Sequence, residues 1–325
     1  MKIGIYGYGN LGTGVECAAY QNPDVELVGI FTRRPPETLV SAYDTPIYPS
    51  AEIMRFEGVI DVLVICGGSA TDLPDMTPRL ARNFNVVDSF DTHSKIPDHF
   101  ARVDSAAREG GNLAVISAGW DPGLFSIART FFDSALAGSI THTFWGRGVS
   151  QGHSDAIRRI DGVLDARQYT IPIIDAMSAA REGMSQTLLP SEKHRRECYV
   201  AIKEGADRER IEEKIKAMPD YFLGYDTTVT FISKEELDRT HKTLSHSGSV
   251  ITTAKTGRCR EHTHTVELSL KLGSNPEFTG SVMICAARAV NKMAKRGEIG
   301  CKTLLDIPPT DYSLYTRDEL LRTFL

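Results

Sequence analysis

The sequence has little that would support a disulfide scaffold, a membrane segment or a secretion signal. Its 325 residues include six scattered cysteines and no CxxC pair, which excludes a small disulfide framework and indicates reduced thiols. No apolar run approaches the length that crosses a bilayer. The first residues, Met1 to Gly4, lead directly into an apolar strand and lack the pattern of a signal peptide. We therefore expect a cytoplasmic protein with no membrane partner.

A large excess of charge is also missing. The 42 acidic residues slightly outnumber the 37 basic ones, which gives a formal net charge of −5. Because the basic residues form no extended patch, we expect no nucleic-acid partner. The GxSxG, HExxH and P-loop patterns are absent as well. Cys259, His262 and His264 lie close together, but no matched second pair of cysteines accompanies them, so we expect no metal ion.

The length and the order of the predicted elements indicate two domains. A chain of 325 residues is too long for one ordinary core. Up to residue 118, short apolar strands alternate with helices, which is typical of a parallel sheet covered on both faces. The expected strands are 2–6, 25–31, 60–66, 85–88 and 112–116, and the expected helices are 10–21, 71–83 and 94–109.

Beyond residue 118 the pattern changes. Longer segments alternate apolar and polar residues, as half-exposed antiparallel strands do. These segments are 139–148, 163–172, 195–203, 225–233, 248–256 and 264–272, with helices near 207–218, 278–295 and 316–325. We therefore predict an α/β domain over residues 1–118 and a second α+β domain with a mostly antiparallel sheet over 119–299. The C-terminal segment from about residue 300 is expected to pack back on the first domain.

The stretch Gly7 to Gly12 reads GYGNLG and matches the pattern GxGxxG. It follows a predicted strand and opens a predicted helix, which is the context that makes this pattern informative. Gly7 permits the tight turn, Gly9 lets a pyrophosphate approach the backbone, and Gly12 allows close packing of helix and strand. The helix N-terminus favours an anion. The first domain is therefore predicted to be a doubly wound, Rossmann-type dinucleotide-binding sheet; the alternative is a glycine-rich turn without a ligand.

The end of the second strand predicts which dinucleotide binds. An acidic residue there would pair with the ribose 2′-hydroxyl, but this sequence has Thr32, Arg33 and Arg34, and no acidic residue accompanies them. A hydroxyl and two guanidinium groups suit a 2′-phosphate. We therefore predict NADP rather than NAD. The alternative is that both arginines are solvated surface residues.

Three further loops follow strands of the predicted sheet, where a ligand of a doubly wound fold lies. They are Cys66–Ser69, Ser89–Asp91 and Gly119–Gly123. Asp91 and Asp121 lie in these loops, where the nicotinamide would be placed. Two carboxylates there favour a cationic substrate group such as an amine, whose proton one of them could accept. The alternative is that each aspartate caps the helix that follows it.

Two polar segments mark the second domain. Phe144–Asp155 is glycine-rich and predicted to be irregular, and it is placed to form the floor of a substrate pocket. Taken alone, a tryptophan such as Trp145 is more often a core residue than the wall of a ligand site. The basic run Lys193–Arg196 is either a solvated face or the source of an arginine that pairs with a substrate carboxylate.

Seven segments, taken in order, resemble the meso-diaminopimelate D-dehydrogenase family. They are GYGNLG, GIFTRR, CGGSATDLP, GWDPGLFSI, HTFWGRGVSQGHSDAIRRI, MPDYFLGY and HSGSVITT. The resemblance runs along essentially the whole chain. It implies a homodimer that oxidises the D-configured carbon of meso-2,6-diaminopimelate with NADP, giving L-2-amino-6-oxopimelate, ammonia and NADPH, in a reversible step of lysine biosynthesis. The first domain would bind NADP, and the second would bind the substrate and the partner subunit.

The resemblance also implies which residues form the site. The cofactor contacts would be Gly7, Tyr8, Gly9, Asn10, Leu11, Thr32, Arg33, Arg34, Cys66, Gly67, Gly68, Ser69, Ser89, Phe90, Asp91, Ala118, Gly119, Trp120, Asp121 and Pro122. The substrate contacts would be Asp91, Asp121, Trp145, Gln151, Gly152, Thr170, Arg196, His246 and Asn275. Asp91 and Asp121 would be catalytic as partners of the reacting amine, and Arg196 would bind the distal carboxylate with Thr170 and His246. The sequence does not choose between an aspartate, His153 and water as the general base that takes the amine proton.

One segment departs from the family, and two other functions remain as alternatives. Residues 257–262 are longer and more basic than expected for the family, and the placement of Asn275 depends on aligning across them. A related NADP oxidoreductase acting on a sugar or another amino or hydroxy acid is the first alternative. Sugar enzymes of this plan carry a Glu-Lys-Pro motif, whereas Val87–Asp91 contains no lysine. A non-catalytic NADP-sensing regulator is the second, and the polar segment 144–155 argues against it.

Overall fold

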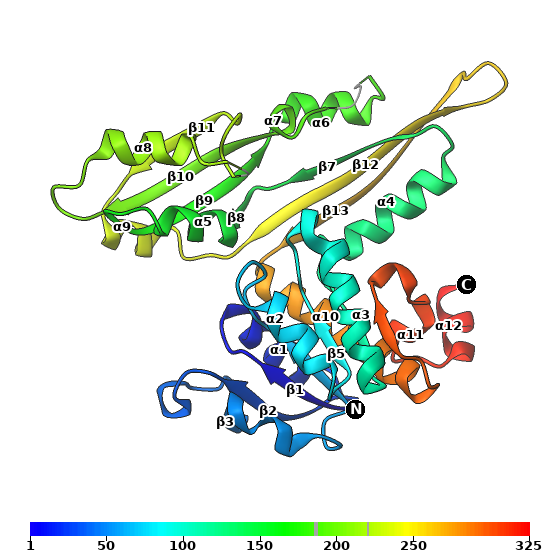
Figure 1. Ribbon diagram of the computed structural model, residues 1–325. Coiled ribbons are helices and arrows are strands. Elements are labelled where there is room, and N and C mark those ends of the chain that lie inside the picture. The colour runs from blue at the N-terminus through cyan, green and yellow to red at the C-terminus, as the bar shows by residue number, and fades with distance from the viewer. Residues whose placement is uncertain (185–187, 220) are drawn as a thin grey trace. The chain divides into compact units, whose positions relative to one another are not determined.

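The computed structural model describes residues 1–184, 188–219 and 221–325, and it divides into two compact units (Figure 1). Unit 1 contains residues 1–127 and 276–325, and unit 2 contains residues 128–275. The predicted boundaries after residues 118 and 299 therefore differ from the observed ones. The larger difference concerns residues 276–299, which were expected in the second domain but belong to the first.

Unit 1 is built on a seven-stranded sheet in which every pair of neighbours is parallel. The strand order is β14-β6-β5-β4-β1-β2-β3, the doubly wound order with one strand added at the edge. The strands are β1 (Lys2–Tyr6), β2 (Glu26–Thr32), β3 (Ile47–Pro49), β4 (Val62–Ile65), β5 (Val86–Asp88), β6 (Leu113–Val115) and β14 (Gly300–Lys302). β14 comes from the C-terminal segment and pairs with β6.

Helices cover both faces of this sheet, and alternation along the strands explains why. In β4, Val62 and Val64 belong to the core beneath α1 and α10, whereas Leu63 and Ile65 belong to the core beneath α2 and α3. The helices of this unit are α1 (Asn10–Tyr20), η1 (Pro36–Thr38), η2 (Ser50–Phe56), α2 (Leu73–Ala81), η3 (His93–Lys95), α3 (Ile96–Gly110), η4 (Leu304–Asp306), α11 (Pro309–Tyr312) and α12 (Arg317–Phe324). The first division between the units falls within α4 (Leu124–Ala135), and the second falls at the start of α10 (Asn275–Lys295). None of the described helices combines the length and apolar character that a bilayer crossing requires.

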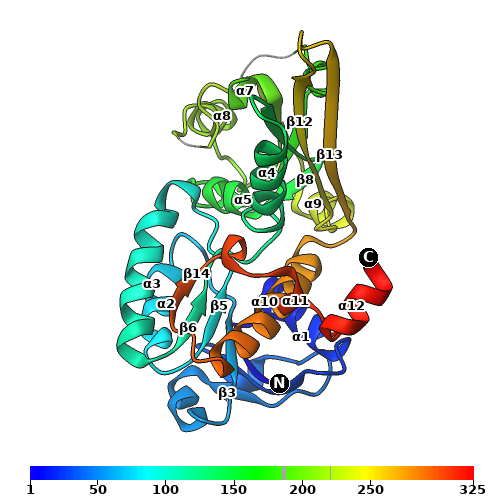
Figure 2. The same ribbon diagram turned by 90° about the vertical axis from the view of Figure 1, so that its right-hand side faces the viewer.

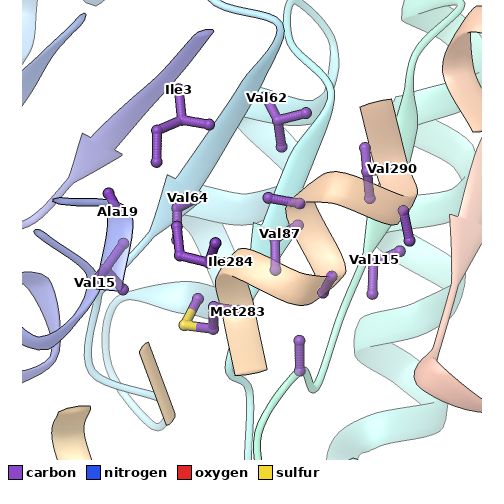
Figure 3. Packing of buried hydrophobic residues seen from close by; sticks show 14 of the residues in the cluster. Ile3, Val15, Ala19, Val62, Val64, Val87, Val115, Met283, Ile284 and Val290 are labelled. Atoms are coloured by element: carbon purple, nitrogen blue, oxygen red, sulfur yellow. The ribbon is translucent and has the colours of Figure 1, made fainter. Parts of the chain in front are cut away.

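Helix α10 belongs to unit 1 because it packs against the sheet and against α1. Figure 3 shows Ile284 of α10 beside Val64 and Val87 of the strands, and Met283 belongs to the same core. A Cβ at Gly280 would lie 2.5 Å from the carbonyl carbon of Gly14 in α1, so only a residue without a side chain permits this approach. The sequence pattern predicted the helix but did not show which core it covers.

Unit 2 contains two sheets. The four-stranded sheet has the order β11-β10-β9-β8, and the three-stranded sheet has the order β13-β12-β7. Every pair is antiparallel except β10 with β11, so the predicted fold class is confirmed. β12 and β13 form the long hairpin seen in Figure 2. The strands are β7 (Ile140–Trp145), β8 (Gly148–Ser150), β9 (Val163–Pro172), β10 (His194–Ile202), β11 (Thr227–Phe231), β12 (His246–Thr256) and β13 (His262–Leu272).

The segment 144–155 is not irregular as predicted, because it contains a strand and the start of a helix. β8 is followed directly by α5, and the Ser150 side chain accepts a hydrogen bond from the backbone N–H of His153, which is an N-cap. Ile157 of α5 then joins the core of the four-stranded sheet. The helices of unit 2 are α5 (Gln151–Arg158), α6 (Ile174–Arg181), α7 (Pro190–Lys193), α8 (Arg208–Lys216) and α9 (Lys234–Thr240).

Candidate functional site

The glycine loop of unit 1 brings backbone close to backbone and leaves one side open. Gly7 has φ +99°, and a Cβ there would lie 2.7 Å from the carbonyl oxygen of Cys66. A Cβ at Gly12 would lie 2.4 Å from the carbonyl oxygen of Gly7, whereas one at Gly9 would meet nothing within 4 Å. Gly7 and Gly12 therefore allow the turn and the helix contact, and Gly9 leaves free space for a ligand beside the main chain.

A cavity opens at this loop, between the ends of β1, β2 and β4. Its walls are formed by Tyr6, Gly7, Tyr8, Gly9, Phe31, Thr32, Arg33, Arg34, Cys66, Gly67, Asp72 and Met76. α1 begins beside it with Asn10 and Leu11, with no side-chain cap at Gly9 and no acidic residue in the first turn. Its first N–H groups and dipole therefore suit a phosphate. The Tyr8 hydroxyl points away, toward the buried carboxylate of Glu16, so Tyr8 contributes backbone to the cavity.

The two arginines of the cavity are held from different sides. An Arg34 Nη2 hydrogen donates to the carbonyl oxygen of Tyr8, and the Arg34 backbone N–H donates to Oγ1 of Thr32 at 3.1 Å. Arg33 forms an ion pair of 2.9 Å with Asp72, a residue 39 positions later. The expectation that no acidic residue accompanies the arginines is therefore wrong. It holds for their neighbours in the sequence, but the folded chain places Asp72 against Arg33. Two cations against one carboxylate still leave this end of the cavity suited to a phosphate.

Asp72 also joins the arginine loop to the loop after β4. Its second carboxylate oxygen accepts a hydrogen bond of 3.0 Å from the backbone N–H of Gly68. A Cβ at Gly67 would lie 2.9 Å from the Asp72 Cβ, so the small residues here let the loop pass closely. Ser69 extends the connection, because its Oγ accepts from the backbone N–H groups of Asp91 at 2.9 Å and Thr92 at 3.2 Å. The loops that carry Cys66–Ser69 and Ser89–Asp91 are therefore fixed to one another.

A buried carboxylate, Asp88, organises the two loops that carry the candidate aspartates. It accepts hydrogen bonds from the backbone N–H groups of Phe90 and Ser117, from Thr77 Oγ1, and it contacts Nε2 of His99 at 2.8 Å. The Asp88 carbonyl accepts from the backbone N–H of Ala118 at 2.8 Å. Phe90 stacks on the His99 ring and is buried. Sequence inspection missed this role because the donors lie up to 29 residues away.

Asp91 and Asp121 do not occupy the cap positions of the helices that follow them. The residue before α4 is Gly123, with φ +127°, and a Cβ there would lie 1.9 Å from the Gly119 carbonyl oxygen. The caps before η3 and α3 are Thr92 and Lys95. In the same turn, the buried Trp120 packs edge-on against Phe125, and the Pro122 carbonyl accepts from the N–H of Gly119. The capping alternative for the two aspartates is therefore not supported.

His93 brings the two aspartate loops together, and the sequence analysis did not identify it. Its Nδ1 lies 2.8 Å from the carbonyl oxygen of Asp91, and its Nε2 lies 4.0 Å from a carboxylate oxygen of Asp121. The Asp121 side chain is 1% exposed and that of His93 is 57% exposed. The Asp121 carboxylate, with the Asp91 carbonyl, raises the pKa of His93 above its usual value.

Arg196 forms the centre of the site in unit 2. Strand register pairs it with Thr170, and its Nη1 donates to Oγ1 of Thr170 at 2.5 Å. The guanidinium stacks over the ring of Tyr225 at 4.2 Å. Arg196 is 7% exposed, its Nε has no hydrogen-bond partner, and among the described residues no carboxylate forms an ion pair with it. A buried cation in this state is costly unless a ligand supplies the anion.

His246 lies against the same pair of strands. A Cβ at Gly148 would lie 2.3 Å from the His246 ring, and Gly148 is the cross-strand neighbour of Thr170. The His246 Nδ1 lies 2.8 Å from the carbonyl oxygen of Ser247, which can only accept, so this nitrogen carries the hydrogen. Burial lowers the pKa of His246, so the ring is neutral and its Nε2 is an acceptor. Thr170, Arg196 and His246 are therefore brought together.

The remaining predicted residues of unit 2 lie at strand or helix ends. The Trp145 ring stacks on His194, with centroids 5.1 Å apart, and the Trp145 backbone N–H donates to His194 Nε2 at 2.7 Å. Gln151 and Gly152 are exposed in the first turn of α5. Asn275 begins α10, and its backbone N–H donates to the carbonyl of Leu244 at 2.8 Å.

Two buried polar side chains near Arg196 were not among the predicted contacts. Gln168 is fully buried on the same strand face as Thr170, and its Oε1 has no partner. His153 bonds Ser150 through Nδ1, and its Nε2 has no partner. Burial, with the nearby Arg196 charge, lowers the pKa of His153 to about 3. A neutral, enclosed imidazole is poorly suited to take a proton at neutral pH, which disfavours His153 as the general base.

A metal centre is not formed by the described part of the chain, where no three histidine, cysteine or acidic side chains converge. Residues 257–261 of this segment form the turn of the β12–β13 hairpin, and His262 is the first residue of β13. His264 bonds the Thr256 hydroxyl there, and His262 lies 3.8 Å from Glu261. These side chains therefore have local partners.

The comparisons with known proteins place the chain in one family. Residues 119–274 match the model of the diaminopimelic acid dehydrogenase C-terminal domain. The meso-diaminopimelate D-dehydrogenase of Acetivibrio thermocellus is 50% identical over 100% of this chain and 98% of its own. A meso-DAPDH mutant from Clostridium tetani E88, solved with DAP, is 47% identical with TM-score 0.94, and an engineered D-amino acid dehydrogenase bound to NADP⁺ is 42% identical with TM-score 0.92. Each structure match covers 100% of this chain and 99% of the other. The chain therefore belongs to the meso-diaminopimelate D-dehydrogenase family.

Proposed function

We propose that this protein oxidatively deaminates the D-centre of meso-2,6-diaminopimelate with NADP⁺, giving L-2-amino-6-oxopimelate, ammonia and NADPH, and that it catalyses the reverse reaction. The observation that carries the proposal is the buried Arg196 guanidinium, which lacks an acidic partner among the described residues and lies beside Thr170. A substrate carboxylate is the group that this arrangement accommodates best.

A solved relative supports the choice of substrate-contacting residues. The Clostridium tetani enzyme carries six substitutions, among them at a glutamine, a threonine, an arginine and a histidine. Those four positions are separated by 19, 26 and 50 residues, which are the intervals separating Gln151, Thr170, Arg196 and His246 here. The equal spacing supports these four residues as substrate contacts.

NADP is the cofactor that the residues of the unit 1 cavity fit. The open backbone at Gly9 and the uncapped start of α1 would hold the pyrophosphate, and Thr32, Arg33 and Arg34 the 2′-phosphate. When bound, the nicotinamide supplies the hydride acceptor. We expect Arg34→Ala to weaken NADP binding by about tenfold or more and to leave NAD binding unchanged, because it removes one charge-assisted contact to phosphate. Equal losses for both cofactors in a titration would contradict this assignment.

The chain's own residues would orient the substrate and manage its proton. Asp91 and Asp121 would hold the reacting amine, and Gln151 and Gly152 the neighbouring carboxylate. Arg196 and Thr170 would bind the distal carboxylate. His246, which the family resemblance placed with them, would instead bind the distal ammonium with Asn275, because its acceptor Nε2 cannot donate to a carboxylate. With the L end fixed in this way, only the D carbon would present its hydrogen for transfer. Selectivity would therefore come from residues remote from the reacting bond.

We further propose that the protein acts as a homodimer in the cytoplasm, with dimer contacts in the second predicted domain and without nucleic-acid or membrane partners. Analytical ultracentrifugation of the purified protein tests the assembly. A sedimentation coefficient that fits a monomer at assay concentrations would remove the dimer from this proposal.

The first test is NADPH formation when the purified protein meets NADP⁺ and meso-diaminopimelate, with the LL and DD isomers and NAD⁺ as controls. Reduction with the meso isomer and NADP⁺ alone is the expected result. If no reduction occurs, a rise in melting temperature on adding diaminopimelate to the NADP complex would still show that diaminopimelate binds. The absence of both would favour an NADP-binding protein of another function.

A further inference from the structure

The imidazole of His93 connects a buried carboxylate with solvent. The ring is 57% exposed, whereas the Asp121 side chain, 4.0 Å from its Nε2, is 1% exposed. We infer that His93 is a positioning residue that shares a proton with Asp121 and passes it between Asp121 and water. This inference rests on the proposed function, because it assigns the proton that leaves the reacting amine.

A main-chain carbonyl decides which nitrogen of His93 exchanges a proton. The Asp91 carbonyl oxygen, 2.8 Å from Nδ1, can only accept a hydrogen bond. Nδ1 therefore carries a hydrogen in both charge states of the ring, and Nε2 is the nitrogen whose proton comes and goes. Nε2 is also the atom that faces Asp121. The fixed tautomer thus directs the exchangeable site toward the carboxylate.

The charges around His93 favour a proton at this place. Asp121 lies beside Nε2, and the Asp91 carboxylate adds a second negative charge from the same turn. Both raise the pKa of His93, and burial of the inner edge of the ring opposes them. The shared proton can lie on either group. If it lies on His93, the two groups form an ion pair of carboxylate and imidazolium. If it lies on Asp121, they form a hydrogen-bonded pair of neutral groups. The pair can therefore hold one proton near neutral pH in either form.

The backbone holds His93 in this orientation. Ser69 Oγ accepts from the N–H groups of Asp91 and Thr92, the two residues before the histidine. The N–H of Lys95 donates to the Thr92 carbonyl at 2.8 Å, which closes the η3 turn. The separation of 4.0 Å needs only a small approach to become a hydrogen bond, as in sites that tighten when substrate binds.

In the deamination direction, one proton leaves the substrate nitrogen and reaches water through two side chains. An N–H bond of the substrate ammonium breaks, the proton moves to a carboxylate oxygen of Asp121, and the nitrogen keeps the electron pair that later forms the C=N bond. The proton then moves from Asp121 to His93 Nε2 and from Nε2 to water. In the amination direction the same atoms return a proton to the product nitrogen. No oxidant beyond NADP⁺ is required.

Nuclear magnetic resonance of the protein with isotope-labelled histidine tests the shared proton without an activity assay. We expect the His93 signal to show hydrogen on Nδ1 in the neutral form and a pKa above the ordinary histidine value. Asp121→Asn is expected to lower that pKa by one unit or more, because the neighbouring charge is removed. A neutral form with hydrogen on Nε2, or an unchanged pKa in Asp121→Asn, would overturn the inference even if the enzyme proves to have another substrate.

Kinetics of His93→Gln tests the relay. We expect kcat for deamination to fall by about tenfold to a hundredfold, with KM for diaminopimelate and NADP affinity changed less than threefold. Added imidazole should restore part of the activity, because the exposed ring leaves room for a small base. The acidic limb of the pH profile should shift in the variant. His262→Gln, which alters another exposed histidine 3.8 Å from a carboxylate, is the matched control and should keep wild-type rates.

The two arms separate failure of this inference from failure of the proposed function. Wild-type protein that forms no NADPH from meso-diaminopimelate would reject the function, while the resonance arm would still decide whether His93 and Asp121 share a proton. Active wild-type protein with an equally active His93→Gln variant would reject the relay alone. A slow variant that imidazole does not rescue, with an unshifted pH profile, would mean that His93 only supports the loop.

Discussion

His93 in unit 1 and His194 in unit 2 share one kind of contact, between Nδ1 and a main-chain carbonyl, but their pKa values are shifted in opposite directions. In each, Nδ1 faces a main-chain carbonyl, that of Asp91 at 2.8 Å and that of Pro190 at 3.3 Å. The other nitrogen differs: Nε2 of His93 faces the Asp121 carboxylate, whereas Nε2 of His194 accepts from the backbone N–H of Trp145 at 2.7 Å. The first contact raises the pKa of His93, and burial lowers that of His194 to about 3.

The comparison shows that the carbonyl at Nδ1 determines the tautomer of the ring, whereas the group that faces Nε2 determines whether the ring is charged. Protonating His194 would place two hydrogens face to face and break its bond to Trp145. Protonating His93 creates an attraction instead. The contrast also separates two tasks within one proposed reaction. The loops of unit 1 exchange a proton, and the strands of unit 2 hold neutral rings beside a buried cation, Arg196.

Removing the Arg196 cation should have the largest effect on the difference between the two units. Arg196→Met should reduce kcat/KM for meso-diaminopimelate by about a hundredfold or more, because a lost buried partner of a carboxylate costs roughly 2–5 kcal/mol. NADP affinity should not change. The unliganded variant should also melt at a higher temperature than the wild type, since methionine replaces a buried charge without an acidic partner among the described residues.

Steady-state kinetics, NADP titration and differential scanning calorimetry give these three results. The pKa of His153 and His194 should rise in the same variant, because the Arg196 charge lowers both. Turnover equal to that of the wild type would show that Arg196 does not bind substrate. A lower melting temperature without ligand would show that its charge is already compensated.

Displacing His246 should have the next largest effect. Gly148→Ala places a Cβ 2.3 Å from the ring, closer than atoms can approach, so the ring must move away from Thr170. We expect kcat/KM for diaminopimelate to fall by about tenfold, on the order of one lost hydrogen bond to a charged group. Gly273→Ala is the control, since a Cβ there meets nothing within 4 Å. Similar kinetics for both variants would remove His246 from the site.

Acid should destabilise the protein partly through His194. Its folded pKa of about 3 lies below the ordinary value of 6.5, so the unfolded chain binds the proton first. The stabilisation is complete above pH 6.5 and is lost as pH falls toward 3. Between pH 7 and 5 this group should remove up to about 2 kcal/mol from the free energy of unfolding. Urea titrations at both pH values should give a smaller difference for His194→Gln, and an identical difference would contradict the assigned state.

The contribution of His93 to the pH dependence of the free energy of unfolding should be opposite in sign to that of His194, and it should be the smallest of these effects. Because its folded pKa is raised, its stabilisation is complete below the ordinary value of 6.5 and disappears as pH rises through the folded pKa. Its exposure makes the contribution small. The difference in unfolding free energy between wild type and His93→Gln should therefore shrink from pH 6 to pH 9. A difference that grows over this range would reverse the sign assigned to the Asp121 contact.

Much of the fold could be predicted because its signals are local. Apolar strands alternating with helices identify the parallel sheet, and alternating segments identify the antiparallel part. β3 (IYP) and β14 (GCK) were missed because these short edge strands lack the apolar residues that mark the equally short β5 and β6. α10 was predicted but assigned to the wrong unit, because the contact of Gly280 with Gly14 depends on residues far apart in the chain.

The candidate site divides in the same way. The glycine loop and the arginines at the end of β2 lie where the strand order predicts a ligand, so position alone identifies them. The family resemblance added Thr170, Arg196 and His246, which the structure brings together. Asp72, Asp88 and His93 have ordinary sequence surroundings, and their importance comes from hydrogen bonds that only the folded chain forms.

Unit 1 consists of two separate chain segments, so its parts leave the ribosome at different times. Residues 128–275 leave the exit tunnel as one continuous block and can fold during synthesis, as domains commonly do. The parallel sheet must wait, because α10 and the edge strand β14 are translated after unit 2. Until then the apolar face near Val64 and Val87 lacks the cover of α10 and packs against α1 alone. A nascent chain arrested before residue 276 is therefore the species that chaperones and proteases should engage most strongly.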